Sequence, residues 1–94
     1  MRDQKYIHFD VLQGIDDVIV TFNTAINHSD MAFDLTRNKE NIISAGFVAY
    51  TVDRDSYNDL IAIPRCYGRS DSLGVQADPE TDSKILRRQM NVDD

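Results

Sequence analysis

The first apolar pattern along the chain is an alternation of apolar and polar side chains. Ile7, Phe9 and Val11 alternate with His8 and Asp10 in residues 6–11. Side chains two positions apart lie on the same face of a strand, so this pattern predicts a short strand with one buried face.

The spacing of the apolar residues changes after Gly14. Helical intervals separate the next apolar residues, which are Ile15, Val18, Ile19, Phe22, Ala25 and Ile26. This spacing predicts a helix near residues 14–27, with Asp16 and Asp17 in its first turn, where they favour the positive end of the helix dipole. Residues 18–21 form a β-branched run that lowers helix propensity, so a strand remains the alternative for this segment.

Three further apolar runs predict strands. Met31, Phe33 and Leu35 are spaced two apart, residues 42–52 form the longest β-rich run, and residues 60–63 form another. Gly46 indicates a bulge or a close approach of two backbones, and Pro64 indicates an edge strand or a bulge. We expect the three runs to form an antiparallel meander.

The last part of the chain has the residues of a helix start. Asp78 suits the N-cap, Pro79 suits the first helical position, and acidic residues follow in the first turn. The predicted helix runs near residues 79–90. Its narrow apolar stripe, which we expect to dock on the sheet or on another chain, consists of Ile85, Leu86 and Met90.

Together these elements predict an α+β fold in a single domain of residues 1–94. The expected architecture is a small antiparallel sheet of about four strands, with one helix near 14–27 and a C-terminal helix near 79–90. A chain of this length buries only about 60–65% of the surface that its unfolded form exposes. Its core is therefore thin, and we expect a homo-oligomer.

Charge is distributed unevenly along the chain. The formal net charge is −6, which argues against general nucleic-acid binding because that function needs a basic face. Residues 1–34 hold six acidic side chains against Arg2 and Lys5, whereas residues 65–88 hold five basic side chains against four acidic ones. An anionic ligand is therefore expected in the later segment.

The sequence also indicates the cellular compartment of the protein. Cys66 is the single cysteine, so the chain forms no internal disulfide and offers no thiol cluster for zinc. The first residues lack the apolar stretch of a signal peptide, and no apolar run approaches the roughly 20 residues that span a bilayer. We expect a cytoplasmic protein that does not associate with membranes.

The segment of residues 65–74 is the strongest candidate for a ligand site. Its two arginines can bind phosphate oxygens bidentately, its serines add donors, and its tyrosine can stack on a base. The candidate ligand-binding residues are Arg65, Tyr67, Arg69, Ser70 and Ser72. The alternative interpretation is a solvated loop in which the Ser70 and Asp71 side chains close a turn.

Other polar residues carry weaker chemical signals. His8 and His28 can act as acid–base groups or metal ligands, but neither lies in a metal-binding spacing, and a structural role is favoured for both. A Cys66–His8 nucleophile pair is conceivable, although a small buried cysteine in a strand is the commoner case. The Asp16–Asp17 pair is better explained by the start of a helix than by a cation. We therefore expect no catalytic residue, no metal and no cofactor.

Two stretches of the chain resemble small proteins encoded by bacteriophages and prophages. They are residues 45–48, Ala-Gly-Phe-Val, and the segment from Cys66-Tyr67-Gly68-Arg69 through Pro79-Glu80 to Arg88-Gln89. The resemblance covers about half of the chain. It implies a phage setting in the host cytoplasm, where small acidic proteins bind and disable host factors, and where some sequester the cyclic nucleotides or ADP-ribose derivatives that serve as defence signals.

These observations rank three functions. The first is a non-enzymatic counter-defence protein that sequesters an anionic nucleotide signal in the 65–74 segment. The alternative is an acidic protein-interaction module that binds and inhibits a host protein. A small hydrolase comes last, because the sequence holds no triad spacing and no metal cluster.

Overall fold

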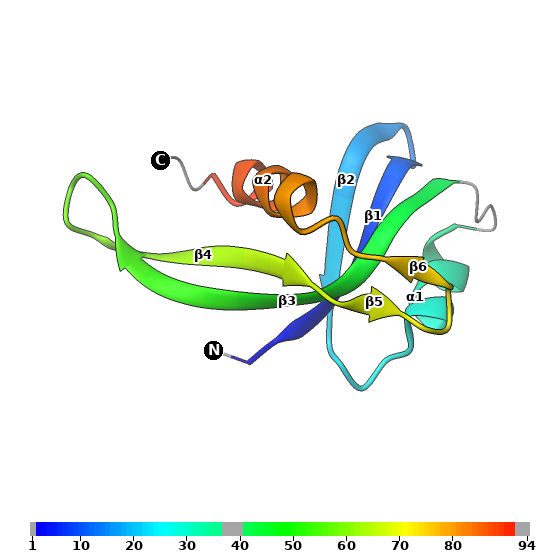
Figure 1. The fold of residues 1–94 in the computed structure, drawn as a ribbon. Helices are drawn as coiled ribbons and strands as arrows, with labels where there is room; N and C mark the ends of the chain where they lie inside the picture. The colour runs from blue at the N-terminus through cyan, green and yellow to red at the C-terminus, as the bar shows by residue number, and fades with distance from the viewer. Residues whose placement is uncertain (1, 37–40, 92–94) are drawn as a thin grey trace.

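The computed structural model describes residues 2–36 and 41–91. Its centre is a curled antiparallel sheet of four strands in the order β2-β1-β3-β4 (Figure 1). The strands are β1 (Gln4–Leu12), β2 (Ile15–Phe22), β3 (Ile42–Arg54) and β4 (Leu60–Tyr67). A two-stranded sheet of β5 (Arg69–Ser70) and β6 (Val75–Gln76) and the helices α1 (His28–Leu35) and α2 (Pro79–Gln89) complete the fold. The predicted α+β class is confirmed.

The prediction of a helix near residues 14–27 is wrong, because Ile15–Phe22 form β2, the strand that was the alternative for this segment. Gln13 and Gly14 both have positive φ values, 51° and 81°, and close a two-residue hairpin between β1 and β2. Both faces of β2 pack against other parts of the fold, since Ile19 belongs to one hydrophobic core and Phe22 to the other. A strand with two covered faces has consecutive apolar residues, and these residues also satisfy helical spacing.

The prediction of a strand at Met31, Phe33 and Leu35 is also wrong, because these residues lie in α1. The helix buries His28 and Ala32, which are four residues apart, while Phe33 is exposed. The buried face therefore follows helical periodicity, and the two-residue spacing of the bulky side chains was misleading.

The predicted runs at 42–52 and 60–63 are both strands, and their hairpin extends well beyond the rest of the sheet (Figure 1). β3 pairs with β1 only over Ile42–Val48, so β4 is the only strand that pairs with its second half in the described part of the chain. Gly46 marks a close backbone approach, as predicted: a Cβ atom at this position would lie 2.4 Å from the carbonyl oxygen of Tyr67. Pro64 lies on β4, an edge strand, which also agrees with the prediction.

The C-terminal helix is confirmed over Pro79–Gln89. The Asp78 side chain accepts a hydrogen bond from the backbone N–H of Thr81 at 3.4 Å, as expected of an N-cap. Leu86 is buried, and Ile85 packs beside it. Neither helix in the described part of the chain is long and apolar enough to cross a membrane.

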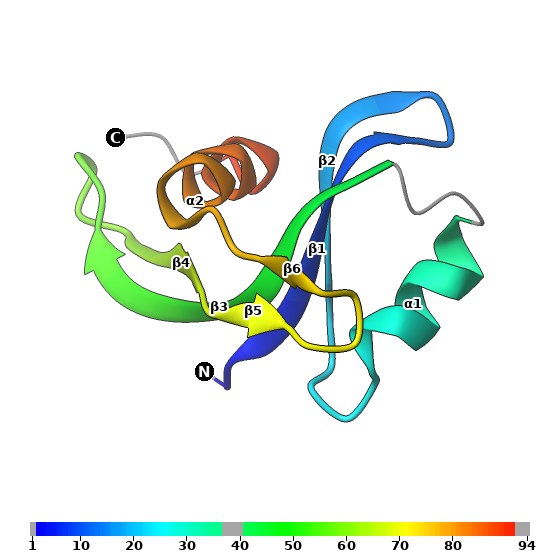
Figure 2. The same cartoon turned by 45° about the vertical axis from the view of Figure 1, so that its right-hand side comes forward.

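The two helices cover opposite faces of the curled sheet (Figure 2). Side chains of α2 also form hydrogen bonds with the backbone of both edge strands, β4 and β2. Ser83 Oγ accepts the backbone N–H of Cys66 on β4 at 2.9 Å. On β2, the Gln89 carboxamide accepts the N–H of Ile19 at 2.6 Å and donates to its carbonyl oxygen at 2.9 Å. α2 therefore connects the two edges of the sheet as well as covering one face.

Candidate functional site

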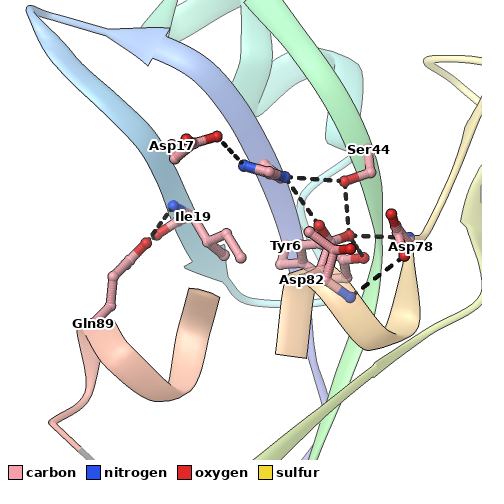
Figure 3. A network of polar contacts seen from close by, with 9 residues as sticks. Tyr6, Asp17, Ile19, Ser44, Asp78, Asp82 and Gln89 are labelled. Atoms are coloured by element: carbon pink, nitrogen blue, oxygen red, sulfur yellow. Dashed lines mark hydrogen bonds and ion pairs between the residues drawn. The ribbon is translucent and has the colours of Figure 1, made fainter. Parts of the chain in front are cut away.

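A buried carboxylate, that of Asp82, organises the polar centre of the molecule (Figure 3). Asp82 lies near the start of α2 and is 0% exposed. Its Oδ2 accepts hydrogen bonds from the hydroxyls of Tyr6 at 2.5 Å and Ser44 at 2.7 Å, and from the backbone N–H of Asp78 at 3.0 Å. Its Oδ1 lies 2.9 Å from Nδ1 of His8. This single side chain therefore links α2 to β1 and β3.

His8 lies between two carboxylates. Its Nδ1 contacts Asp82, and its Nε2 lies 3.2 Å from Oδ1 of Asp17 on β2. Burial lowers the pKa of His8, but the two carboxylates outweigh burial and raise this pKa above its ordinary value of 6.5. Burial likewise raises the pKa of Asp82, but its hydrogen bonds, led by that with His8, outweigh burial and lower this pKa below 3.8. Both shifts favour the imidazolium–carboxylate form of the pair over the neutral form.

Ser44, His8 and Asp82 do not form a catalytic triad, although they contact one another. In a triad the serine and the carboxylate bind opposite nitrogens of the imidazole. Here Ser44 Oγ lies 3.3 Å from Nδ1 of His8, the same nitrogen that Asp82 contacts. All three side chains are buried, so a substrate would not reach the hydroxyl. We assign this network to stability, which agrees with the structural role favoured for His8.

Cys66 is a buried residue of β4. Burial is the largest cause that raises the pKa of its thiol, to about 11. The thiol is therefore protonated at neutral pH and is a weak nucleophile. The contacts of His8 are with Asp17, Asp82 and Ser44, which gives no support to a Cys66–His8 pair.

The candidate binding site is a pocket of about 420 Å³ beside the segment of residues 65–74, which we call the Lys5–Arg69 pocket. Four parts of the chain meet there: β1, the start of α1, β3 at Phe47, and the end of β4 with β5 and the turn after it. Its lining residues are Lys5, Asn27, His28, Phe47, Tyr67, Gly68, Arg69, Asp71 and Ser72.

Two aromatic rings form one wall of the pocket. Phe47 and Tyr67 pair across β3 and β4 and stack with centroids 5.7 Å apart and planes 26° from parallel. Tyr67 remains 42% exposed, so part of its ring is open to a ligand. Its hydroxyl donates to Asp3 at 2.5 Å, and this hydrogen bond is the largest cause that raises the pKa of Tyr67. The ring is therefore held in place and uncharged, as a stacking surface requires.

Two cationic side chains line the same pocket. Lys5 Nζ donates to the carbonyl oxygen of Ile26 at 2.8 Å, which leaves further ammonium protons for a ligand. Arg69 Nε lies 3.0 Å from Oδ1 of Asp71, and both side chains are largely exposed. Exposed ion pairs of this kind are weak, so a ligand anion can replace Asp71 at the guanidinium.

The start of α1 adds neutral polar groups. Ser72 Oγ accepts the backbone N–H of Ser29 in the first turn of α1 at 3.1 Å, and the Ser72 hydroxyl proton remains available as a donor. His28 Nε2 lies 2.8 Å from the carbonyl oxygen of Gly46, so this nitrogen is the protonated one. Burial is the main cause that lowers the pKa of His28, and the imidazole is therefore neutral at pH 7 with Nδ1 as an acceptor.

Of the five ligand-binding residues predicted from the sequence, three line the pocket and two do not. Tyr67, Arg69 and Ser72 line the Lys5–Arg69 pocket. Arg65 lies on the same face of β4 as Tyr67 but is not part of the lining. Ser70 is buried, and its Oγ accepts the backbone N–H of Leu73 at 3.2 Å, so it supports the turn between β5 and β6.

The sequence did not identify Lys5, Asn27, His28 and Phe47 as pocket residues. They are far from the 65–74 segment along the chain, and the antiparallel pairing of β1 with β3 and of β3 with β4 brings them close. One signal was present: Lys5 is one of only two basic residues in the strongly acidic first 34 residues.

A second hollow, of about 490 Å³, lies on the other face of the long hairpin. Arg2, Gln4, Tyr50 and Met90 are among its lining residues, and the Tyr50 hydroxyl donates to Gln4 at 2.8 Å. It is slightly larger than the Lys5–Arg69 pocket. We favour the smaller pocket as the site because two cations and an open aromatic face meet there.

The Lys5–Arg69 pocket is equipped to bind rather than to react. Its side chains offer cationic and neutral donors together with a stacking surface. Among the residues described by the structure, no group of three or more His, Cys, Asp or Glu side chains is placed to hold a metal ion. Comparisons with protein families, curated proteins and solved structures found no match to this chain.

Proposed function

We propose that this protein is a non-enzymatic binding protein that sequesters a small anionic nucleotide in the Lys5–Arg69 pocket. The observation that carries the proposal is the convergence of Lys5 and Arg69 with the open ring of Tyr67 around one pocket. The pocket volume of about 420 Å³ lies within the usual range for small-molecule sites. Such a ligand would be a cyclic nucleotide or an ADP-ribose derivative.

Each part of a nucleotide has a matching group in the pocket. The phosphate oxygens would accept hydrogen bonds from the Arg69 guanidinium, the Lys5 ammonium and the Ser72 hydroxyl. The base would stack on Tyr67, whose ring is already fixed by Phe47 and by the hydrogen bond to Asp3. The N-terminus of α1, which borders the pocket at Asn27 and His28, would favour the same negative charge.

The chemistry of the surrounding residues supports sequestration over catalysis. His28 uses Nε2 to bond the carbonyl oxygen of Gly46 and is neutral, so it is not poised as a general acid. The Cys66 thiol and the Ser44 hydroxyl are buried. The resemblance of two segments to phage and prophage proteins supplies the proposed biological setting, in which removal of a nucleotide signal counters host defence.

Removal of either pocket cation is expected to weaken nucleotide binding by at least about tenfold, since each charged hydrogen bond contributes roughly 1.5–3 kcal/mol. The measurement is isothermal titration calorimetry of the wild type, Lys5→Ala and Arg69→Ala against cyclic di- and trinucleotides and ADP-ribose isomers. Arg88→Ala, which removes an exposed charge on α2 outside this pocket, should bind like the wild type.

Two outcomes would contradict this proposal. One is the absence of binding heat from the wild type with every nucleotide in the series. The other is binding that survives both Lys5→Ala and Arg69→Ala unchanged, which would place the ligand elsewhere on the protein.

A further inference from the structure

His28 is the most deeply buried side chain that lines the Lys5–Arg69 pocket, with 4% of its surface exposed. Its imidazole meets the rings of Phe22 and Phe47 edge-on, with ring centroids 5.6 and 5.8 Å away and planes close to perpendicular. Nε2 lies 2.8 Å from the carbonyl oxygen of Gly46, which anchors one side of the ring to β3. His28 therefore has a fixed position and orientation at the inner end of the pocket.

The other ring nitrogen of His28, Nδ1, has no hydrogen-bond partner among the described residues. In that part of the chain, no fully enclosed side-chain nitrogen or oxygen lacks a partner. Nδ1 is therefore accessible. Because so little of His28 is exposed, Nδ1 is accessible where the residue lines the pocket. Nε2 carries the proton of the neutral ring, so Nδ1 presents a lone pair to a ligand.

The charged groups of the pocket lie nearer to its mouth than His28 does. The side chains of Arg69 and Asp71 are 57% and 92% exposed. Lys5 Nζ reaches outward to the carbonyl oxygen of Ile26, in the exposed chain before α1. The lone pair of Nδ1 repels a phosphate oxygen, whereas the cations attract it. A nucleotide is therefore expected to place its phosphates at the mouth of the pocket and its base at the inner end.

The stacking surface determines which part of the base meets His28. The rings of Tyr67 and His28 both contact Phe47, with centroids 5.7 and 5.8 Å from it. A base stacked on Tyr67, with its sugar toward the mouth, directs the atoms farthest from the sugar at the imidazole. In adenine and cytosine this position holds an exocyclic amino group, which donates. In guanine and uracil it holds a carbonyl oxygen, which accepts.

We propose that Nδ1 of His28 accepts a hydrogen bond from this amino group, so that the pocket selects nucleotides of adenine or cytosine over those of guanine or uracil. The inference rests on the proposed nucleotide binding and names the class of base. A bound ligand shields Nδ1 from solvent, so the ligand itself has to supply the donor. Adenine should bind more tightly than cytosine, because its larger ring system covers more of Tyr67.

Isothermal titration calorimetry with matched nucleotides tests this selection. The two members of each pair share the sugar and phosphates, and the second carries an oxo group where the first carries the amino group. The pairs are cyclic di-AMP with cyclic di-IMP, ADP-ribose with its hypoxanthine analogue, and CMP with UMP. The wild type is expected to bind the amino member at least about tenfold more tightly, since the oxo member leaves a buried acceptor unpaired. Purine analogues with hydrogen at this position should bind with intermediate affinity, because they lack the donor but add no acceptor.

His28→Gln separates base selection from a structural role. The glutamine carboxamide can still donate to the carbonyl oxygen of Gly46, but it offers no acceptor at the place of Nδ1. This variant should bind the two members of each pair with similar affinity. A purely structural role would instead weaken both members and preserve their ratio. Arg69→Ala is the matched control, because it acts on the phosphates that the members share and should leave the ratio unchanged. Circular dichroism confirms that both variants are folded.

The outcomes distinguish this inference from the proposed function. Equal wild-type affinity for the two members of every pair, or tighter binding of the oxo member, would overturn the inference and leave nucleotide sequestration standing. A His28→Gln variant that keeps the full preference would overturn it as well. If the wild type bound no nucleotide, the proposed function and the inference would both be wrong.

Discussion

Replacement of Asp82 by alanine is expected to lower the free energy of unfolding by about 3–5 kcal/mol, the usual cost when one member of a buried ion pair is removed. The Asp82 carboxylate accepts hydrogen bonds from the Tyr6 and Ser44 hydroxyls and from the N–H of Asp78, and it contacts His8. Without it, buried donors on two strands lose their acceptor, and α2 loses its main polar link to the sheet.

Urea unfolding followed by circular dichroism measures this effect. Asp71→Ala is the matched control, because Asp71 is an exposed acidic residue whose contact with Arg69 is a surface ion pair. It should change the free energy of unfolding by less than about 1 kcal/mol. If Asp82→Ala were as mild as Asp71→Ala, the network would not hold α2 on the sheet.

The stability of the protein should pass through a maximum near pH 6.5. The pKa of His8 is raised by Asp82 and Asp17 despite burial, so its contribution is fully present below 6.5 and is lost as the pH rises through the raised pKa. The pKa of His28 is lowered, chiefly by burial, so its contribution is fully present above 6.5 and is lost as the pH falls through the lowered pKa. Each tenfold difference in proton affinity between the folded and unfolded states contributes about 1.4 kcal/mol.

Asp82 adds a further loss of stability in acid. Its pKa is lowered by its hydrogen bonds, despite burial, from an ordinary value of 3.8. Its contribution is therefore present above 3.8 and is lost as the pH falls through the lowered pKa. In strong acid the protein is expected to lose much of the stability that Asp82→Ala removes.

Urea midpoints measured from about pH 3 to pH 8.5 test this profile, and two variants separate the histidines. His8→Gln should remove the decline above pH 6.5, and His28→Gln should remove the rise as the pH approaches 6.5 from below. A midpoint that does not change between pH 5 and pH 8.5 in the wild type would contradict the assigned pKa directions.

The sequence predicted the elements whose local signals agree with their environment. The Asp78-Pro79 start predicted α2. The alternation at residues 6–11 predicted the strand β1 but not its burial, because Tyr6 and His8 are buried as well as Ile7 and Phe9, so both faces of this strand are covered. β2 was mistaken for a helix because its apolar residues face both cores, and that double burial arises only after α1 and α2 have packed on opposite faces. The helix α1 was mistaken for a strand because its bulky Phe33 is exposed while the small Ala32 is buried.

The part of the candidate site that lies in one short segment was predictable, and the part that tertiary packing brings to it was not. Tyr67, Arg69 and Ser72 lie in one short segment, so composition alone drew attention to them. Lys5 and His28 reach the pocket through strand pairing and through the docking of α1, which local sequence does not reveal. Ser70 has the same hydroxyl as Ser72, and only the fold separates the buried Ser70 from Ser72, which lines the pocket.

The most direct test of the proposed sequestration is to identify what the protein releases after binding. The purified protein is equilibrated by dialysis with cyclic di- and trinucleotides and ADP-ribose isomers, recovered, denatured by heat, and the released small molecules are analysed by mass spectrometry. We predict that one nucleotide is enriched with the wild type, is released chemically unchanged, and is not enriched with Arg69→Ala. Enrichment of no nucleotide, or release of a chemically altered one, would contradict the account.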